Sequence, residues 1–175
     1  RSESKVDANT LLAQSSVAGS GDYTLLILYA TLALGASFLC SILEAVLLST
    51  SISYVKVLEQ KGSRVAHLWA RFKDEPERPL TAILTLNTIA HTVGALGVGA
   101  EVAAMVEGTE SEALMMAIAS SVLTLGILVL SEIIPKTLGA LYWKNLSVFS
   151  AYTLRGLILI LLPIVMPMEW MRNLF

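Results

Sequence analysis

The chain has 175 residues, of which 55% are hydrophobic and 15% are charged, and its formal net charge is −2. Soluble domains carry closer to a quarter charged residues, and here the apolar residues are gathered in long blocks, so the composition excludes an ordinary soluble domain and indicates membrane spans. The sequence contains no basic arm and no nucleic-acid motif. Its one cysteine, Cys40, excludes an internal disulfide and a thiolate metal cluster.

The predicted elements begin after a polar stretch rich in small residues, residues 1–21, which we expect to be a disordered tail or a cloning remnant outside the fold. Three apolar blocks follow at about residues 22–50, 80–106 and 113–134. Each is long enough to cross a bilayer, because roughly 20 helical residues span the hydrocarbon. The sequence therefore predicts an all-α integral membrane protein with three transmembrane helices.

The first connection, about residues 52–75, repeats apolar residues at helical spacing and is interrupted by Gly62. We expect two short amphipathic helices on the membrane surface. Their apolar positions are Val55, Leu58, Val65, Leu68, Trp69 and Phe72.

The two connections differ in charge. The first, with its flanks, is rich in Lys and Arg, whereas the second, "EGTESE", holds three acids and no base. Because short basic loops stay in the cytoplasm, this asymmetry predicts a cytoplasmic first connection, an external N-terminus and a cytoplasmic C-terminus in the cell membrane.

A fourth apolar block, about residues 146–172, holds Arg155 near its middle and Pro163 and Pro167 toward its end. A central arginine costs about 2.5–3.5 kcal/mol in a span, whereas an interfacial helix lets its side chain reach the headgroups. The residues alone leave a span and an interfacial helix open. No internal repeat is visible, so assembly of two chains is a natural way to complete a transporter.

Polar residues recur on one face of each predicted span. The first span carries Ser37, Ser41 and Glu44, at spacings of four and three, and the second carries Asn87 and His91, four apart. We expect such faces to be buried against one another, because lipid does not accept them.

The third span ends in "LVLSEIIPKTLG", which holds Ser131, Glu132, Pro135 and Lys136, and Ser121 lies near the face of Glu132. Pro135 cannot donate to the carbonyl of Ser131, so it frees backbone oxygens beside a carboxylate. Carboxylate, hydroxyl and carbonyl oxygens suit hard cations such as Mg²⁺ or Ca²⁺. The pattern predicts a cation site in the membrane.

Two other functions compete with an ion transporter. An intramembrane hydrolase would need a hydrogen bond between Ser41 and His91, but no glycine-flanked serine motif supports it and the proline-broken acid would go unexplained. We therefore expect no enzymatic activity. A non-transporting membrane anchor or Mg²⁺ sensor that regulates a partner would use the same ligands as a transporter.

Three motifs in order carry a resemblance to a known family. "SILEAVLLS", "LNTIAHTVG" and "SEIIPK" resemble the first-, second- and third-helix motifs of the transmembrane domain of the CNNM/CorC family. The resemblance covers about residues 22–172.

The resemblance implies a homodimeric Mg²⁺ transporter, with Mg²⁺ export in exchange for Na⁺. It also implies three spans, a cytoplasmic helix pair and a juxtamembrane belt helix at 146–172. The family's Mg²⁺ site falls by motif on Ser41, Asn87 and Glu132, with backbone carbonyls nearby. Glu44 and Lys136 match further motif positions whose roles stay open.

The chain departs from the family pattern at two positions, since His91 replaces an asparagine and Ser131 replaces a frequent glycine. His91 could change a contact beside the site or add pH sensitivity. We place both residues, with Ser37, Glu44, Pro135 and Lys136, beside the site or along the ion path. Family members normally carry cytoplasmic CBS domains after this region, so we expect the chain to be a truncated membrane domain.

Overall fold

The computed structural model describes residues 23–163, so the predicted tail and the last part of the predicted belt helix, 164–172, lie outside the described residues. Helices joined by short turns make up the described part. In chain order they are α2 (Tyr23–Ser49), α3 (Ile52–Gln60), α4 (Ala66–Asp74), α5 (Glu77–Val106), α6 (Glu112–Gly126), the π-helix η1 (Ile127–Ile133) and α7 (Ile134–Ile160).

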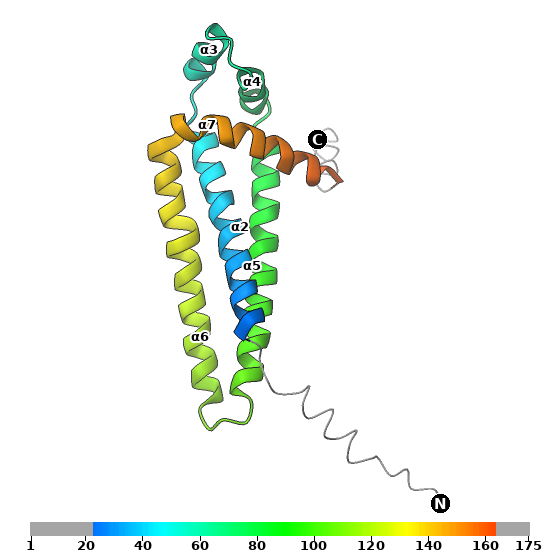
Figure 1. Ribbon diagram of the computed structural model, residues 1–175, viewed down its shortest axis with the longest axis vertical. Coiled ribbons are helices and arrows are strands. Elements are labelled where there is room, and N and C mark those ends of the chain that lie inside the picture. Colours follow the sequence, from blue (N-terminus) through cyan, green and yellow to red (C-terminus); the bar gives the residue numbers. More distant parts are fainter. Residues whose placement is uncertain (1–22, 164–175) are drawn as a thin grey trace, which may run out of the picture.

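The long helices form a bundle with one axis (Figure 1). α2 and α5 run antiparallel and pack side by side, and α6 continues without a break through η1 into α7. Tyr23–Ser49, Glu77–Val106 and the continuous stretch Glu112–Ile160 are each long and apolar enough to cross a membrane. The sequence prediction of an all-α fold with three membrane-crossing helices is confirmed.

Small residues bring these helices together. A Cβ atom added to Gly94 would collide with the Cβ of Ala33, and one added to Gly97 would lie 2.5 Å from the ring of Tyr29. In lipid, where apolar side chains gain little by leaving their solvent, such close backbone approach is a principal source of helix association. These glycines therefore set the contact between α2 and α5.

The predicted pair of short helices is formed by α3 and α4. Gly62 lies between them with φ +65°, a conformation that L residues rarely adopt, and the Ser51 side chain accepts a hydrogen bond from Tyr54 N–H at the start of α3. All six apolar side chains assigned to the inner faces of these helices are buried.

Two hydrogen bonds fix this pair to the bundle. Lys73 Nζ donates to the carbonyl of Leu47 at the end of α2 over 2.7 Å, and Trp69 Nε1 donates to the carbonyl of Ser147 on α7 over 3.2 Å. A cation is favourable at a helix C-terminus, where carbonyl groups lack helical partners. Partial burial lowers the pKa of Lys73 below its usual value.

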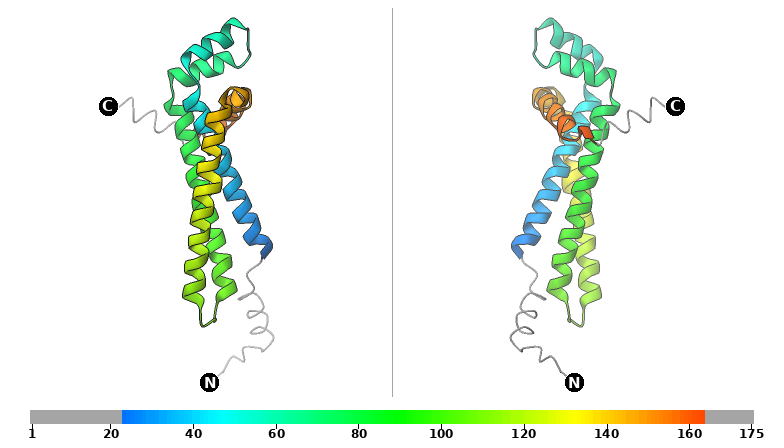
Figure 2. Two further views of the ribbon diagram at one scale, coloured as in Figure 1. Left: turned by 90° about the vertical axis from the view of Figure 1, so that its left-hand side faces the viewer. Right: turned by 90° about the vertical axis from the view of Figure 1, so that its right-hand side faces the viewer.

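α7 bends at Tyr142, whose backbone leaves the helical region with φ −104° and ψ 18°. Beyond the bend, the helix lies across the end of the bundle as a belt (Figures 1 and 2). The helix that contains the third predicted span thus runs on to this bend. At the bend, Trp143 contacts Tyr54 edge to face, with ring centroids 4.8 Å apart, so α3 braces the turn.

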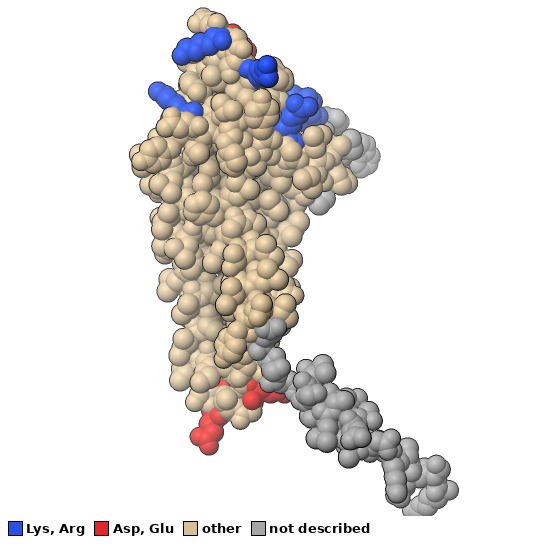
Figure 3. Space-filling model, viewed as in Figure 1, with Lys and Arg blue, Asp and Glu red and all other residues tan. Residues whose placement is uncertain are grey.

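Charge is segregated along the long axis. Lys and Arg side chains gather at the end that carries α3, α4 and the belt, with few acidic side chains visible among them, and only Asp and Glu side chains are visible as charged groups at the opposite end beside the α5–α6 turn (Figure 3). Between them lies a surface without charged groups on the face shown. We refer to the end that carries α3, α4 and the belt as the basic end, and to the end beside the α5–α6 turn as the acidic end.

Candidate metal site

The third span changes its helical winding where the predicted site lies. Residues Ile127–Ile133 form a π-helix, and the N–H of Ile134 bonds the carbonyl of Val129, five residues earlier. Such wide turns are rare and are frequent at functional sites. Pro135, which is buried, follows directly. Glu132 therefore lies on an irregular stretch of backbone at membrane depth.

Pro135 has no N–H to donate to the carbonyl of Ser131, four residues earlier. A side chain on another helix supplies the donor instead. Ser41 Oγ, on α2, donates a 2.6 Å hydrogen bond to the carbonyl of Ser131, and both residues are buried. Ser131 in turn donates its own hydroxyl to the carbonyl of Ile127 over 2.7 Å. The bond from Ser41 joins the π-helix to α2, and Glu132 is the next residue along the chain.

A second polar contact joins α2 to α5. Ser37 Oγ and His91 Nε2 lie 2.6 Å apart and share a hydrogen bond. Because the two helices are antiparallel, one turn up α2 from Ser37 corresponds to one turn back along α5 from His91. Ser41 and Asn87 therefore lie at the same level of the bundle, on faces that meet.

Two oxygen-bearing side chains of this region lack partners. Asn87 Oδ1 is buried without a hydrogen bond. Glu132 is half-buried and forms no hydrogen bond or ion pair with any residue of 23–163. A buried oxygen atom without a hydrogen bond lowers the stability of the fold, and polar groups at membrane depth usually face a partner or a water-filled cavity. Both side chains thus keep lone pairs available for a cation.

Glu44 and Lys136 form an ion pair across α2 and α7, with Nζ and Oε2 3.0 Å apart. Both side chains are part-exposed at the surface of the chain. Each carries one unit of charge, so the pair is neutral, and Glu132 is the acid of this region whose charge stays uncompensated.

The nine predicted residues lie on α2, α5, η1 and α7, and α2 contacts each of the other three elements. Six of them take part in the contacts described: Ser37, Ser41, Glu44, His91, Ser131 and Lys136. Pro135, Asn87 and Glu132 complete the set.

One sequence expectation fails. Ser121 does not join the site, because it is exposed and bonds the carbonyl of Ala117 in its own helix. The Ser41–His91 hydrogen bond that a hydrolase would need is not formed, since His91 bonds Ser37 and Ser41 bonds a carbonyl. Within residues 23–163 no group of three or more His, Cys, Asp or Glu side chains could hold a metal ion, so a site here must draw on hydroxyl, amide and carbonyl oxygens.

Sequence reasoning missed the π-helix and the role of Gly139. A Cβ atom on Gly139 would lie 2.8 Å from the Cβ of Ala45 and 3.0 Å from the carbonyl oxygen of Ile42. This glycine, one turn after Pro135, lets α7 approach α2 closely enough for Ser41 to reach the Ser131 carbonyl. Its position in the motif "PKTLG" was a usable signal, because glycines inside spans often mark close helix contacts.

Comparison with known proteins adds the family. The Cyclin M transmembrane N-terminal domain (CNNM) matches residues 28–175. The chain belongs to the CNNM family. It is 34% identical over 139 residues to a UPF0053 protein of Synechocystis sp., and 31% identical over 150 residues to a UPF0053 protein of Haemophilus influenzae. These matches cover 79% and 86% of the chain.

The CNNM chain also matches the UPF0053 inner membrane protein YfjD of Escherichia coli, with 28% identity over 116 residues, or 66% of the chain. The matches span 39%, 33% and 25% of the three relatives, in the order given, so the chain covers well under half of each. The resemblance read from the three sequence motifs is confirmed: this is a multi-pass membrane protein of the CNNM/CorC family.

Proposed function

We propose that this CNNM-family membrane domain transports Mg²⁺, which it binds at Ser41, Asn87, Glu132 and nearby backbone carbonyl oxygens. The observation that carries the proposal is the pair of unpartnered oxygens, Asn87 Oδ1 and the Glu132 carboxylate, on two helices that both contact α2. The ligand chemistry is hydroxyl, amide, carboxylate and carbonyl oxygen, which is what Mg²⁺ prefers.

Each ligand has a distinct role in this proposal. Glu132 supplies the negative charge that offsets the cost of dehydrating the ion. The Ser41 hydroxyl already donates its hydrogen bond to the Ser131 carbonyl, so its oxygen lone pairs are free to face a cation. Asn87 adds a neutral oxygen from the opposite helix. Mg²⁺ demands near-octahedral geometry at about 2.0–2.1 Å and Ca²⁺ longer, more flexible coordination, so a site of short, packed ligands favours Mg²⁺.

Transport follows from the way the ligands are distributed. Because α2, α5 and η1 each supply one ligand, a small rotation of one helix against the others opens or closes the coordination shell. The proposal includes coupling to Na⁺, which would use overlapping oxygens on the return, and a homodimer that completes the path. α6, which buries no residue in the single chain, offers an apolar face for such assembly. CBS domains would follow the belt helix on the cytoplasmic side.

A flux assay tests this function. Purified protein reconstituted in liposomes with an entrapped Mg²⁺-sensitive dye should move Mg²⁺ down an imposed gradient, and Glu132→Gln should abolish the flux. Replacing Na⁺ by choline on the opposite side should slow the flux if Na⁺ is coupled. Saturable Mg²⁺ binding without any flux would overturn transport and favour a Mg²⁺ sensor. Absence of both binding and flux would overturn transporter and sensor alike and favour a membrane anchor.

A further inference from the structure

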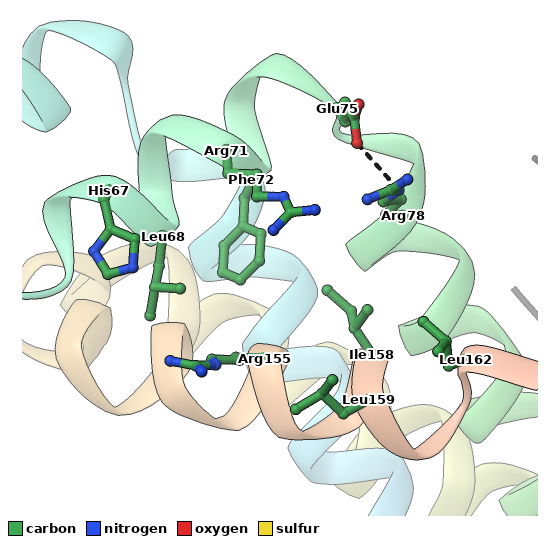
Figure 4. A pocket seen from close by; sticks show the side chains of 10 residues that line it. All are labelled: His67, Leu68, Arg71, Phe72, Glu75, Arg78, Arg155, Ile158, Leu159 and Leu162. Carbon is green, nitrogen blue, oxygen red and sulfur yellow. Dashed lines mark ion pairs between the residues drawn. The ribbon is translucent and has the colours of Figure 1, made fainter. Parts of the chain in front are cut away.

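A cavity of about 330 Å³ lies at the basic end, away from the proposed ion site (Figure 4). α4 and the start of α5 form one wall, and the belt half of α7 forms the other. The proposed Mg²⁺ transport uses none of its residues. The volume falls at the lower end of the range for small-molecule sites, which suits a polar headgroup better than a whole lipid.

The lining has two chemistries. Apolar side chains from both walls, Leu68 and Phe72 above and Ile158 below, cover its interior. Cationic side chains surround them, among which Arg71 and Arg155 are both exposed. A cavity that is apolar inside and cationic around its edge is complementary to an amphipathic anion.

Arg71 and Arg155 differ from the third arginine of this cavity. Arg78 Nε pairs with Glu75 Oε2 over 3.1 Å, whereas neither Arg71 nor Arg155 forms an ion pair with a carboxylate of residues 23–163. The charge of these two arginines is therefore available to a ligand. Planar guanidinium groups match phosphate oxygens, so two of them on facing walls form a receptor for a phosphate group.

The position of the cavity in the fold indicates that its ligand comes from the bilayer. The belt half of α7 lies across the end of the spans, at the level where a bilayer surface would lie (Figures 1 and 2). Next to Arg155, the belt exposes Leu159 and Ile160, at 61% and 75% of their surface, as apolar area on which an acyl chain can rest. Basic pockets at the cytoplasmic side of membrane proteins commonly bind anionic lipid headgroups.

We propose that this cavity binds an anionic phospholipid of the leaflet at the basic end, with its phosphate between Arg71 and Arg155 and its chains along the belt. A free phosphate would leave the apolar lining unused. A zwitterionic lipid brings a cationic headgroup against two uncompensated arginines. The lipid bridges α4 to α7 and so stabilises the docked pair of short helices at the end of the spans.

Lipid titration of the purified chain in detergent tests the proposal. Short-chain phosphatidylglycerol, phosphatidylcholine and glycerol 3-phosphate are added in turn, and bound lipid is counted by native mass spectrometry while the unfolding temperature is recorded. The expected result is saturable binding of one phosphatidylglycerol per chain with a raised unfolding temperature, and weaker binding of the other two. Equal binding of phosphatidylcholine would overturn the role of charge, and equal binding of glycerol 3-phosphate would overturn the lipid as the occupant.

Two double variants are compared. The first pair, Arg71→Gln with Arg155→Gln, removes the two cations of the cavity. The second pair, Lys56→Gln with Lys61→Gln, is the control and removes two exposed cations of the same end outside the cavity. The first pair should weaken phosphatidylglycerol binding on the order of tenfold or more, because each cation near a membrane surface contributes about 1 kcal/mol. The second pair should leave it within about twofold. Equal losses in the two pairs would overturn the cavity as the binding site. All four side chains are exposed, so both proteins should fold, and the unfolding temperature without lipid checks this.

Discussion

At the scale of single residues, the proposed site includes two oxygen-bearing groups that the chain itself leaves unused. Asn87 Oδ1 and Glu132 have no partner within residues 23–163, while neighbouring Ser37, Ser41 and His91 are all hydrogen-bonded. A buried unsatisfied oxygen lowers stability by about 1–3 kcal/mol. Proteins keep such defects at functional positions, where removing them raises stability and lowers activity.

Asn87→Leu is the substitution that separates these two effects. Leucine has a similar volume and no buried polar atom, so the unfolding temperature should stay the same or rise, while Mg²⁺ affinity falls at least tenfold. Calorimetry and thermal unfolding of one preparation measure both. Thr88→Val, next along α5 on the exposed side, is the control and should change neither quantity. If Asn87→Leu kept full Mg²⁺ affinity, Asn87 would be no ligand.

The sequence predicts which face of a helix these residues occupy, but it does not predict which residues they contact on other helices. Spacings of three and four put Ser37, Ser41 and Glu44 on one side of a helix, and the structure brings all three into interhelical contacts. Which residue meets which depends on the register of α2 against α5 and η1. That register is set by contacts such as Gly94 against Ala33, which are distant in sequence and carry no local signal.

At the scale of elements, the third predicted span determines the geometry of the proposed site. The sequence indicates a break at Pro135, but the irregular winding begins eight residues earlier, at Ile127, and ends before the proline. Pro135 removes one donor, and the chain responds by widening the preceding turn. No pattern in the sequence predicts the bend at Tyr142, because it depends on the contact between Trp143 and Tyr54.

Gly139→Ala should therefore weaken Mg²⁺ binding indirectly, by changing how α7 packs on α2. Its new methyl group would meet the Ile42 carbonyl and Ala45, pushing α7 from α2, and overpacking of this kind costs about 1–3 kcal/mol. Thermal unfolding should show this loss, and Mg²⁺ affinity should fall as Ser41 moves from the Ser131 carbonyl. Gly156→Ala, in the same helix with open space around it, is the control and should be neutral or slightly stabilising. Equal stability of the two variants would contradict the packing account.

At the scale of the whole molecule, two patterns in the sequence carry most of the fold. The apolar blocks predict three spans, and the helical spacing in the first connection predicts the α3–α4 pair, because both depend on local periodicity. The choice between a fourth span and an interfacial helix could not be made from residues alone. The structure lays this segment across the bundle, where Arg155 is exposed and an apolar core forms beneath α4.

The separation of charge along the long axis leads to a prediction about orientation. Basic short connections stay in the cytoplasm, so the α3–α4 pair should be inside and the α5–α6 turn outside. In a Cys40→Ser background, Ser111→Cys should react with a membrane-impermeant maleimide on intact cells. Arg64→Cys should react only after the membrane is opened. Both sites are exposed, so the reverse labelling pattern would show that the domain is inserted the other way round.

The central claim is that Glu132 holds Mg²⁺ within the membrane. Its most direct test is Mg²⁺ titration of the detergent-purified chain by calorimetry, with Ca²⁺ and Na⁺ as competitors, for the native protein, Glu132→Gln, and Glu110→Gln as a control that removes an exposed acid near the α5–α6 turn. Saturable Mg²⁺ binding should be lost in Glu132→Gln and kept in Glu110→Gln. Native Mg²⁺ affinity in a folded Glu132→Gln protein would contradict the claim and leave the π-helix as a structural irregularity.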